Sequence, residues 1–161
     1  MHPRADGCYA VLRRTPSCAW YGAVWFLAAV LVCCTQQPEV VFHARSGELV
    51  RVTVETAQTP VQRSLGLMYR TELPVGRGML FITDHEAVQS FTMRNTSIPL
   101  DMIFIGSDMR VVGIIENAQP FHEGPFAIGT PSRYVLEVPA GFCRRRGISR
   151  GDVVRFINIT L

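Results

Sequence analysis

Three polar side chains that could bind a ligand lie in one short segment between two apolar runs. Arg94 and Asn95 follow the apolar run that ends at Met93, and Asp101 lies at the start of the run that ends at Ile105. A guanidinium can hold an anion in a fork, and a neighbouring carboxylate could orient that anion or act as a base. The same residues could instead brace a bend between two buried strands, because buried polar groups require hydrogen-bond partners. Both interpretations place Arg94 beside Asp101.

Met93, Arg70 and Glu137 complete the set of ligand-binding candidates. Glu137 lies inside an apolar run, and Glu116 ends the strand expected before it. Two carboxylates on neighbouring strands could form a glycosidase pair if they lie about 5–9.5 Å apart. The absence of any tryptophan after Trp25 argues against a carbohydrate site, where large aromatic faces supply much of the contact.

The elements that position these residues are mostly strands. From residue 48 to 56 the chain alternates strictly, with Val50, Val52 and Val54 on one face, which is typical of a half-buried strand. Thr59-Pro60 predicts the start of a short helix that runs to Leu67, and Gly147 predicts the end of a second helix. The other expected elements are strands at 78–83, 88–93, 102–105, 110–116, 134–138 and 153–159, the second helix at 140–146 and a long loop at 118–132.

Many short strands with two small helices predict a closed or nearly closed antiparallel sheet. The expected fold class is α+β and mainly antiparallel β: a single compact, barrel-like domain with two short helices behind an N-terminal leader. Residues 1–34 are assigned to the leader, 35–47 to a linker and first strand, and 48–161 to the domain. The chain has no Walker pattern and no nucleophile elbow.

The N-terminus has the features of a targeting segment. Arg13 and Arg14 end a positively charged region, and the apolar stretch 19–32 has the length of a signal-peptide core. Leu31-Val32-Cys33-Cys34 resembles a relaxed lipoprotein signal with Cys34 as the lipidated residue. The alternative is an uncleaved membrane helix from 16 to 37. Both predict an exported domain tethered to the membrane in the cell envelope, on its periplasmic or outer face.

Composition and spacing disfavour several classes of partner and cofactor. Beyond Cys34 the chain contains thirteen arginines and twelve acidic residues, so no basic surface for nucleic-acid binding is expected. Cys143 is the only cysteine of the domain and is expected to be a small buried core residue. No cofactor and no metal is predicted, because the histidines lie far apart and the methionines fall within apolar runs where they fill the core.

Three motifs together resemble a known family. They are Gly66-Leu67-Met68-Tyr69-Arg70, Gly76-Arg77-Gly78-Met79-Leu80-Phe81 and the run from Ser90 to Ile105. The chain is similar in these motifs to the Domain of Unknown Function 192 family, from about Glu48 to the C-terminus. The resemblance implies a compact, mainly β, barrel-like domain. It implies no reaction, because the family is uncharacterised.

Two classes of function remain open at this point. The first is a non-catalytic, envelope-tethered domain that binds an unknown small ligand or an envelope protein. The second is an enzyme of unknown reaction that uses Asp101, with Arg94 as the anion clamp. We expect the non-catalytic function, because no second catalytic group can be identified from the sequence.

Overall fold

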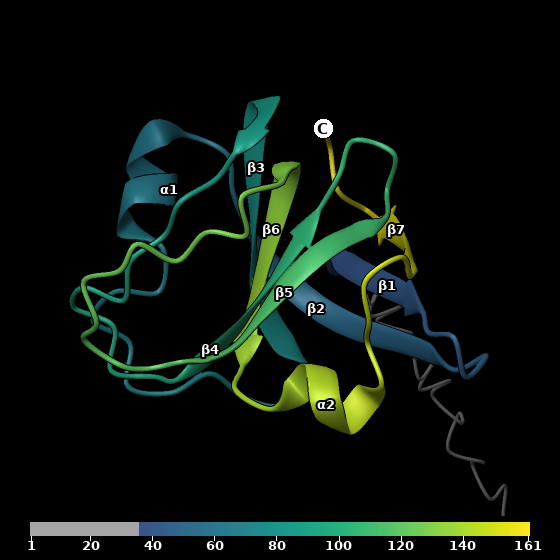
Figure 1. The fold of residues 1–161 in the computed structure, drawn as a ribbon, viewed down its shortest axis with the longest axis horizontal. Helices are drawn as coiled ribbons and strands as arrows, with labels where there is room; N and C mark the ends of the chain where they lie inside the picture. The colour runs from purple at the N-terminus through teal and green to yellow at the C-terminus, as the bar shows by residue number, and fades with distance from the viewer. Residues whose placement is uncertain (1–35) are drawn as a thin grey trace, which may run out of the picture. The chain divides into compact units, whose positions relative to one another are not determined.

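The alternating segments of the sequence form the strands of one curled sheet. The computed structural model describes residues 36–161, so the predicted leader and Cys34 lie outside the described residues. The sheet has seven strands in the order β5-β4-β6-β3-β2-β1-β7 (Figure 1). Their bounds are β1 (Glu39–His43), β2 (Leu49–Ala57), β3 (Arg77–Val88), β4 (Leu100–Ile105), β5 (Val111–Ala118), β6 (Pro131–Pro139) and β7 (Val153–Ile157).

The sheet curls into a half-barrel whose first and last strands meet at one corner. Every neighbouring pair is antiparallel except β2 and β3, which are parallel. Arg110 and Val153 form a bridge between the start of β5 and the start of β7. The backbone N–H of Val154 also donates to Met109 O at 2.8 Å. The mainly antiparallel, barrel-like fold with two short helices is therefore confirmed.

Strict alternation gives the sheet two apolar faces. One face carries Val52 of β2 and Leu136 of β6, together with Phe142 and Cys143 from the second helix. The opposite face carries a second cluster, which includes three methionines and two phenylalanines: Met79, Phe81, Met93, Met102 and Phe104. Because successive side chains of a strand point to opposite faces, β3, β4 and β6 contribute to both clusters.

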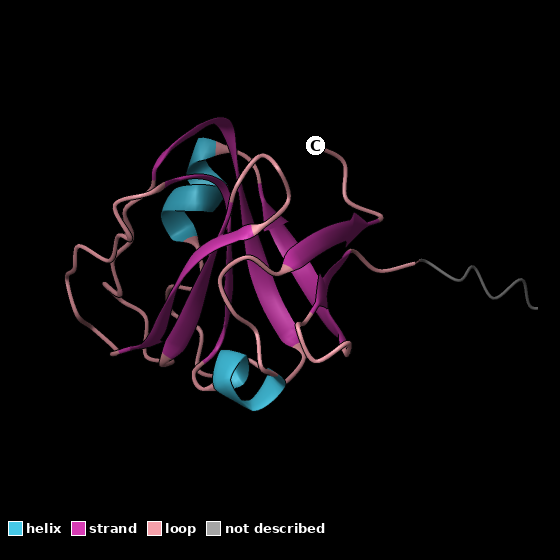
Figure 2. Ribbon diagram, turned by 45° about the vertical axis from the view of Figure 1, so that its right-hand side comes forward, coloured by secondary structure: helices cyan, strands magenta, loops and turns pink. Residues whose placement is uncertain are grey.

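The two helices lie at opposite ends of the sheet (Figures 1 and 2). Helix α1 (Pro60–Leu65) begins with a capping box, in which Gln62 N donates to Thr59 Oγ1 while the Gln62 side chain accepts the backbone N–H of Thr59. None of its residues is buried. Helix α2 (Phe142–Arg146) ends at Gly147 in the left-handed conformation, as expected. Within residues 36–161, neither helix has the length and apolar character needed to cross a membrane.

One predicted strand is absent, and another is longer than predicted. Residues 89–97, here called the crossing segment, contain only a single bridge, between Phe91 and Phe126. The predicted strand at 88–93 is therefore wrong: Phe91 packs into the second apolar cluster without a ladder. The strand expected at 78–83 is longer than predicted, because β3 continues to Val88 through a register shift opposite β6.

Candidate functional site

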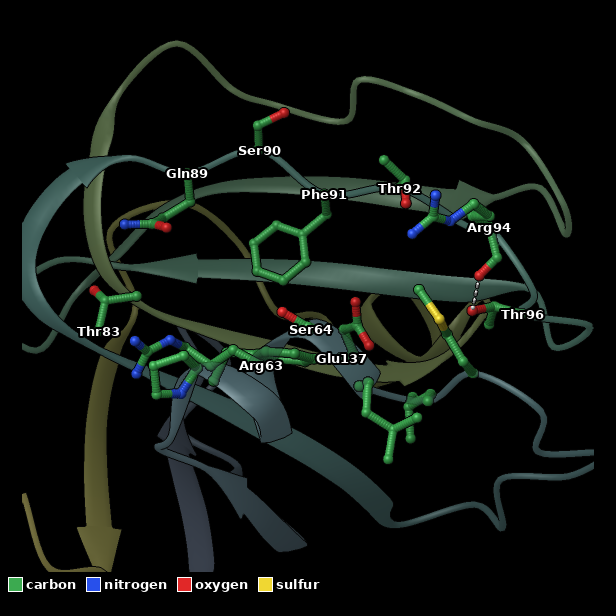
Figure 3. Close-up of a pocket in the computed structure, with 16 residues that line it drawn as sticks. Arg63, Ser64, Thr83, Gln89, Ser90, Phe91, Thr92, Arg94, Thr96 and Glu137 are labelled. Carbon is green, nitrogen blue, oxygen red and sulfur yellow. Dashed lines mark hydrogen bonds between the residues drawn. The ribbon is translucent and has the colours of Figure 1, made fainter.

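A cleft of about 460 Å³ lies between α1 and the crossing segment. Its walls come from three places: the helix and the turn after it, the crossing segment, and strands β3 and β6 beneath them (Figure 3). The lining residues are Pro60, Arg63, Ser64, Leu65, Gly66, Leu67, Met68, Phe81, Thr83, Gln89, Ser90, Phe91, Thr92, Arg94, Thr96 and Glu137.

The cleft exists because α1 is held beside the second apolar cluster without burying a face of its own. Arg63 fixes the helix: its guanidinium donates to Gln58 O and, at 3.0 Å, to Ile82 O of β3. Asp84 lies 3.9 Å from the same guanidinium. Arg63 is therefore bound to the protein and is not free to bind a ligand.

Aromatic rings form the apolar wall of the cleft. Phe91 packs edge-to-face against Phe81 with 5.1 Å between ring centroids, and against Phe104 with 6.1 Å. Such pairs are worth about 0.5–1.5 kcal/mol beyond their buried area, so they fix the ring orientations. In Figure 3 the Phe91 ring lies in the middle of the cavity's lining.

Hydrogen bonds join the turn after α1 to the crossing segment at residues that do not themselves line the cleft. Tyr69 N donates to Asn95 O at 2.8 Å, and Asn95 Nδ2 donates to the Tyr69 hydroxyl at 3.0 Å. Ser97 Oγ donates to Arg70 O at 2.8 Å. Asn95 therefore holds the crossing segment against the turn after α1 through its contacts with Tyr69.

The predicted ligand-binding residue Arg70 points away from the cleft. Its guanidinium binds both carboxylate oxygens of Glu55, at 2.6 and 2.7 Å. The hydrogen bond from Arg70 lowers the pKa of Glu55. Arg70 is not among the residues that line the cleft. Its ion pair with Glu55 instead connects β2 to the turn after α1.

Glu137 is the most unusual residue of the cleft. Its side chain shares a face of β6 with Val135, and its neighbours across the sheet are Met79 and Met102. The residue is only 4% exposed, yet within residues 36–161 its carboxyl group makes no hydrogen bond and no ion pair. Burial raises the pKa of Glu137 to about 8, so the group is largely protonated at neutral pH. Figure 3 shows its carboxyl group directed into the cavity.

Arg94 is the cation at the mouth. The residue is exposed and lines the cleft, and within residues 36–161 its guanidinium forms no ion pair. Its backbone carbonyl accepts a hydrogen bond from Thr96 Oγ1 at 3.3 Å (Figure 3). The charged groups that line the cleft are thus Arg63, which is bound to the protein, Arg94 and Glu137.

Asp101 lies on the other face of the sheet, so the expected pairing of Arg94 with Asp101 is wrong. The Asp101 carboxylate accepts three backbone N–H groups: Asn117 at 2.9 Å and Gly141 at 3.0 Å on Oδ1, and Cys143 at 2.9 Å on Oδ2. The reason is strand alternation on β4, which points Met102 toward the second apolar cluster and Asp101 toward α2. Asp101 is a brace, but it braces α2 and not the bend beside Arg94.

The remaining predicted residues are structural. Met93 is 1% exposed and packs in the second apolar cluster, and it does not line the cleft. Cys143 is buried and unpaired; burial, and then the neighbouring Asp101 carboxylate, raise the pKa of its thiol. Within residues 36–161 no three His, Cys, Asp or Glu side chains gather as a metal site would require.

Arg94, Asn95 and Glu137 were predicted from the sequence, but the presence of Glu137 and Arg94 in one cleft was not. Phe91 and Ser64 were not predicted as cleft residues. The positions of Phe91 and Ser64 depend on how the crossing segment and α1 pack against the sheet, which no local pattern reports. A charged residue within an apolar strand was the one available signal, and it marks Glu137.

Comparison with known proteins identifies a family without a known activity. The family model DUF192, described as "Uncharacterized ACR", matches residues 41–156. No curated protein matches the chain.

Two crystal structures resemble this one. A protein of unknown function from Novosphingobium aromaticivorans DSM 12444 is 41% identical, with a TM-score of 0.70, over 73% of this chain and 83% of that one. A protein from Sinorhizobium meliloti 1021, described as a "putative transcription regulator", is also 41% identical, with a TM-score of 0.72, over 74% of this chain and 93% of that one.

Proposed function

The chain belongs to the Domain of Unknown Function 192 family, and we propose that its domain is a non-catalytic module that binds a small organic ligand in the cleft between α1 and the crossing segment. One observation carries the proposal: Glu137 is buried at the cleft and has no partner within the described residues. The carboxyl group faces the cavity, so a molecule in the cleft can supply the hydrogen bond or ion pair that the described residues do not.

The dimensions and lining of the cleft support a small molecule as the occupant. Ligand pockets commonly enclose about 300–1,000 Å³ and combine an apolar wall with a few polar groups. Here the wall is formed by Phe81, Phe91 and Met68, and the cavity is about 460 Å³. Arg94 at the mouth would hold an anionic group of the ligand.

The alternative, an enzyme that uses Asp101 with Arg94 as anion clamp, lacks the required geometry. A base must come within hydrogen-bond reach of the proton it takes. Asp101 is fully buried and bound to three backbone amides on the face away from the cleft. The binding function requires none of this chemistry.

Native mass spectrometry of the full-length protein, extracted from its own envelope, tests the binding function. We expect a bound small molecule on the wild type, and its loss in Ser64→Phe, because Ser64 is exposed on α1 and lines the cleft. Ser46→Phe is the matched control, since Ser46 lies in the exposed turn between β1 and β2. A molecule retained equally by both variants would place the binding site elsewhere and refute the proposal.

We propose further that the domain is exported and tethered to the membrane of the cell envelope. The support is the positively charged region ending at Arg14, the apolar stretch 19–32 and the lipoprotein-like sequence before Cys34. The near balance of arginines and acids beyond Cys34 gives no reason to add a nucleic-acid partner.

The tether is tested by fatty-acid labelling and membrane fractionation of the wild type and of Cys34→Ala. We expect labelling of the wild type, and its loss together with release from the membrane in the variant. Cys33→Ala serves as the matched control and should keep both the label and the membrane location. Membrane retention of an unlabelled wild type would indicate the uncleaved helix in place of the lipid.

A further inference from the structure

The unpartnered carboxyl group of Glu137 restricts the chemistry of the ligand. Three backbone N–H groups satisfy the buried Asp101, whereas no group of residues 36–161 forms a hydrogen bond or ion pair with the carboxyl of Glu137. A ligand that completes the site must therefore present a hydrogen-bond donor, an acceptor or a cation to this group.

Within residues 36–161, no cation pairs with Glu137. The chain contains no lysine. Of the two arginines that line the cleft, Arg63 is bound to two backbone carbonyls and lies near Asp84. Arg94 is exposed at the mouth, and neither arginine contributes to the pKa of Glu137, which burial alone perturbs. Among the described residues, these two arginines are the only other charged ones that line the cleft.

The surroundings of Glu137 favour a positively charged group over an anion or an uncharged one. Phe81 and Phe91 present aromatic rings to the cleft, and aromatic faces attract ammonium groups by about 0.5–2 kcal/mol. Met68 adds a polarisable thioether to the lining. An anionic group at the same depth would lie beside a carboxyl group, and the described residues offer it no free cation there.

We propose, as a development of the ligand-binding function above, that the ligand carries a protonated amine that forms an ion pair with the Glu137 carboxylate. The apolar body of the ligand lies against Phe81 and Phe91, and an anionic group, where the ligand has one, faces Arg94. The ligand class is thus an organic amine with an aromatic or aliphatic body.

Binding of such an amine must release a proton near neutral pH. The free site holds Glu137 as the neutral acid, because burial raises its pKa to about 8. An ammonium ligand stabilises the carboxylate, so the carboxyl proton passes to the buffer as the ion pair forms. An anionic or neutral ligand would leave that proton in place.

Three compounds test the inference: 3-phenylpropylamine, 3-phenylpropanol and 3-phenylpropionate. They share a phenyl ring on a three-carbon chain and differ in the terminal polar group. Each is titrated calorimetrically into full-length protein in detergent near neutral pH, in two buffers of different ionisation enthalpy. Ser64→Phe in the same detergent is the blank. We expect the amine to bind at least about tenfold more tightly than the alcohol, equivalent to about 1.4 kcal/mol, with release of close to one proton.

The variant Glu137→Gln should reduce amine affinity to about that of the alcohol, a loss of at least about tenfold, and should abolish the proton release. Arg155→Gln is the matched control, because Arg155 is exposed on β7 and does not line the cleft. Thermal unfolding of each variant confirms that it is folded.

The possible failures separate the inference from the function on which it rests. If the alcohol or the propionate binds as tightly as the amine, without proton release, the amine assignment is refuted and the cleft remains a ligand site. If none of the three binds, the amine assignment is also refuted. The ligand-binding function itself is then decided by native mass spectrometry: it stands if the wild type carries a bound molecule that the Ser64→Phe variant lacks.

Discussion

Asp101 Oδ2 accepts a hydrogen bond from the backbone N–H of Cys143 at 2.9 Å, so that strand β4 binds the first turn of helix α2 from 42 residues away. Gly141, at the N-cap of α2, has no side chain with which to cap the helix. The first N–H groups of a helix have no partner within the helix and carry the positive end of its dipole. The Asp101 carboxylate therefore takes the place of a local capping residue.

The first prediction is that Asp101→Ala strongly destabilises the protein. Three backbone N–H groups would lose a charged acceptor, and such bonds contribute about 1.5–3 kcal/mol each. We expect urea unfolding of the full-length variant to show a free energy of unfolding lower by more than about 3 kcal/mol.

Asp108→Ala is the control for this experiment. Asp108 is an exposed aspartate in the β4–β5 turn, and within the described residues its carboxylate accepts a single hydrogen bond, from the Arg110 N–H at 3.2 Å. We expect its loss to cost less than about 1 kcal/mol. A comparable, small effect of both substitutions would show that Asp101 does not hold α2.

The fold was predictable where one local rule decides it. The alternation at Val50, Val52 and Val54 predicted β2, and Thr59-Pro60 predicted α1; both are confirmed. The parallel pairing of β2 with β3 was not expected. It arises because the connection through α1 brings the chain back alongside β2 in the same direction. Sequence periodicity reports the faces of a strand, not its partner.

The candidate site was less predictable for the same reason. Arg94 and Asp101 are close in sequence, yet the register of β4 against β6, with Asp101 opposite Val138, turns Asp101 away from the cleft. A shift of one residue would reverse that direction. Glu137 was a candidate because it interrupts an apolar strand, but its lack of a partner depends on packing that the sequence alone does not report.

The second prediction concerns Gly66, which ends α1 and lines the cleft. Its φ of +48° and ψ of −132° favour glycine, and an added Cβ would lie 3.1 Å from the Phe81 ring. We expect Gly66→Ala to lower the free energy of unfolding by about 1–3 kcal/mol, measured by urea unfolding.

Gly47→Ala separates backbone strain from crowding at Gly66. Gly47 has a φ of +84°, but nothing lies within 4 Å of its added Cβ. The loss at Gly66 should exceed the loss at Gly47, because only Gly66 meets an aromatic ring. Equal losses would mean that the approach to Phe81 has no energetic consequence.

The third prediction is that Arg70→Gln has little effect on stability and none on the cleft. Arg70 and Glu55 have side-chain exposures of 35% and 58%, and exposed ion pairs contribute about 0–1 kcal/mol. Because Arg70 lowers the pKa of Glu55, the contribution exists above the ordinary carboxyl pKa and is lost as the pH falls through the lowered one.

We therefore expect calorimetric titration with 3-phenylpropylamine to give the same affinity for Arg70→Gln as for the wild type. Urea unfolding should show a small loss of stability that disappears in acid. A fall in amine affinity like that expected for Glu137→Gln would instead make Arg70 part of the binding site.

The fourth prediction follows from the raised pKa of Glu137. The folded protein binds the carboxyl proton up to about pH 8, whereas the unfolded chain releases it near 4.5. Between these values the folded state holds more protons than the unfolded state, so stability falls as the pH rises, by up to about 1.4 kcal/mol per pH unit from this group. Below the lower value the contribution of Glu137 is fully present.

Glu137→Gln should remove this slope, because the amide does not titrate and has nearly the shape of the protonated acid. Urea unfolding of both full-length proteins from about pH 5 to 8 gives the difference between them, in which the other titrating groups cancel. We expect the variant to gain on the wild type steadily as the pH rises. A constant difference across the range would mean that Glu137 is ionised in the folded protein, and the buried acid would then have a partner that the described residues do not provide.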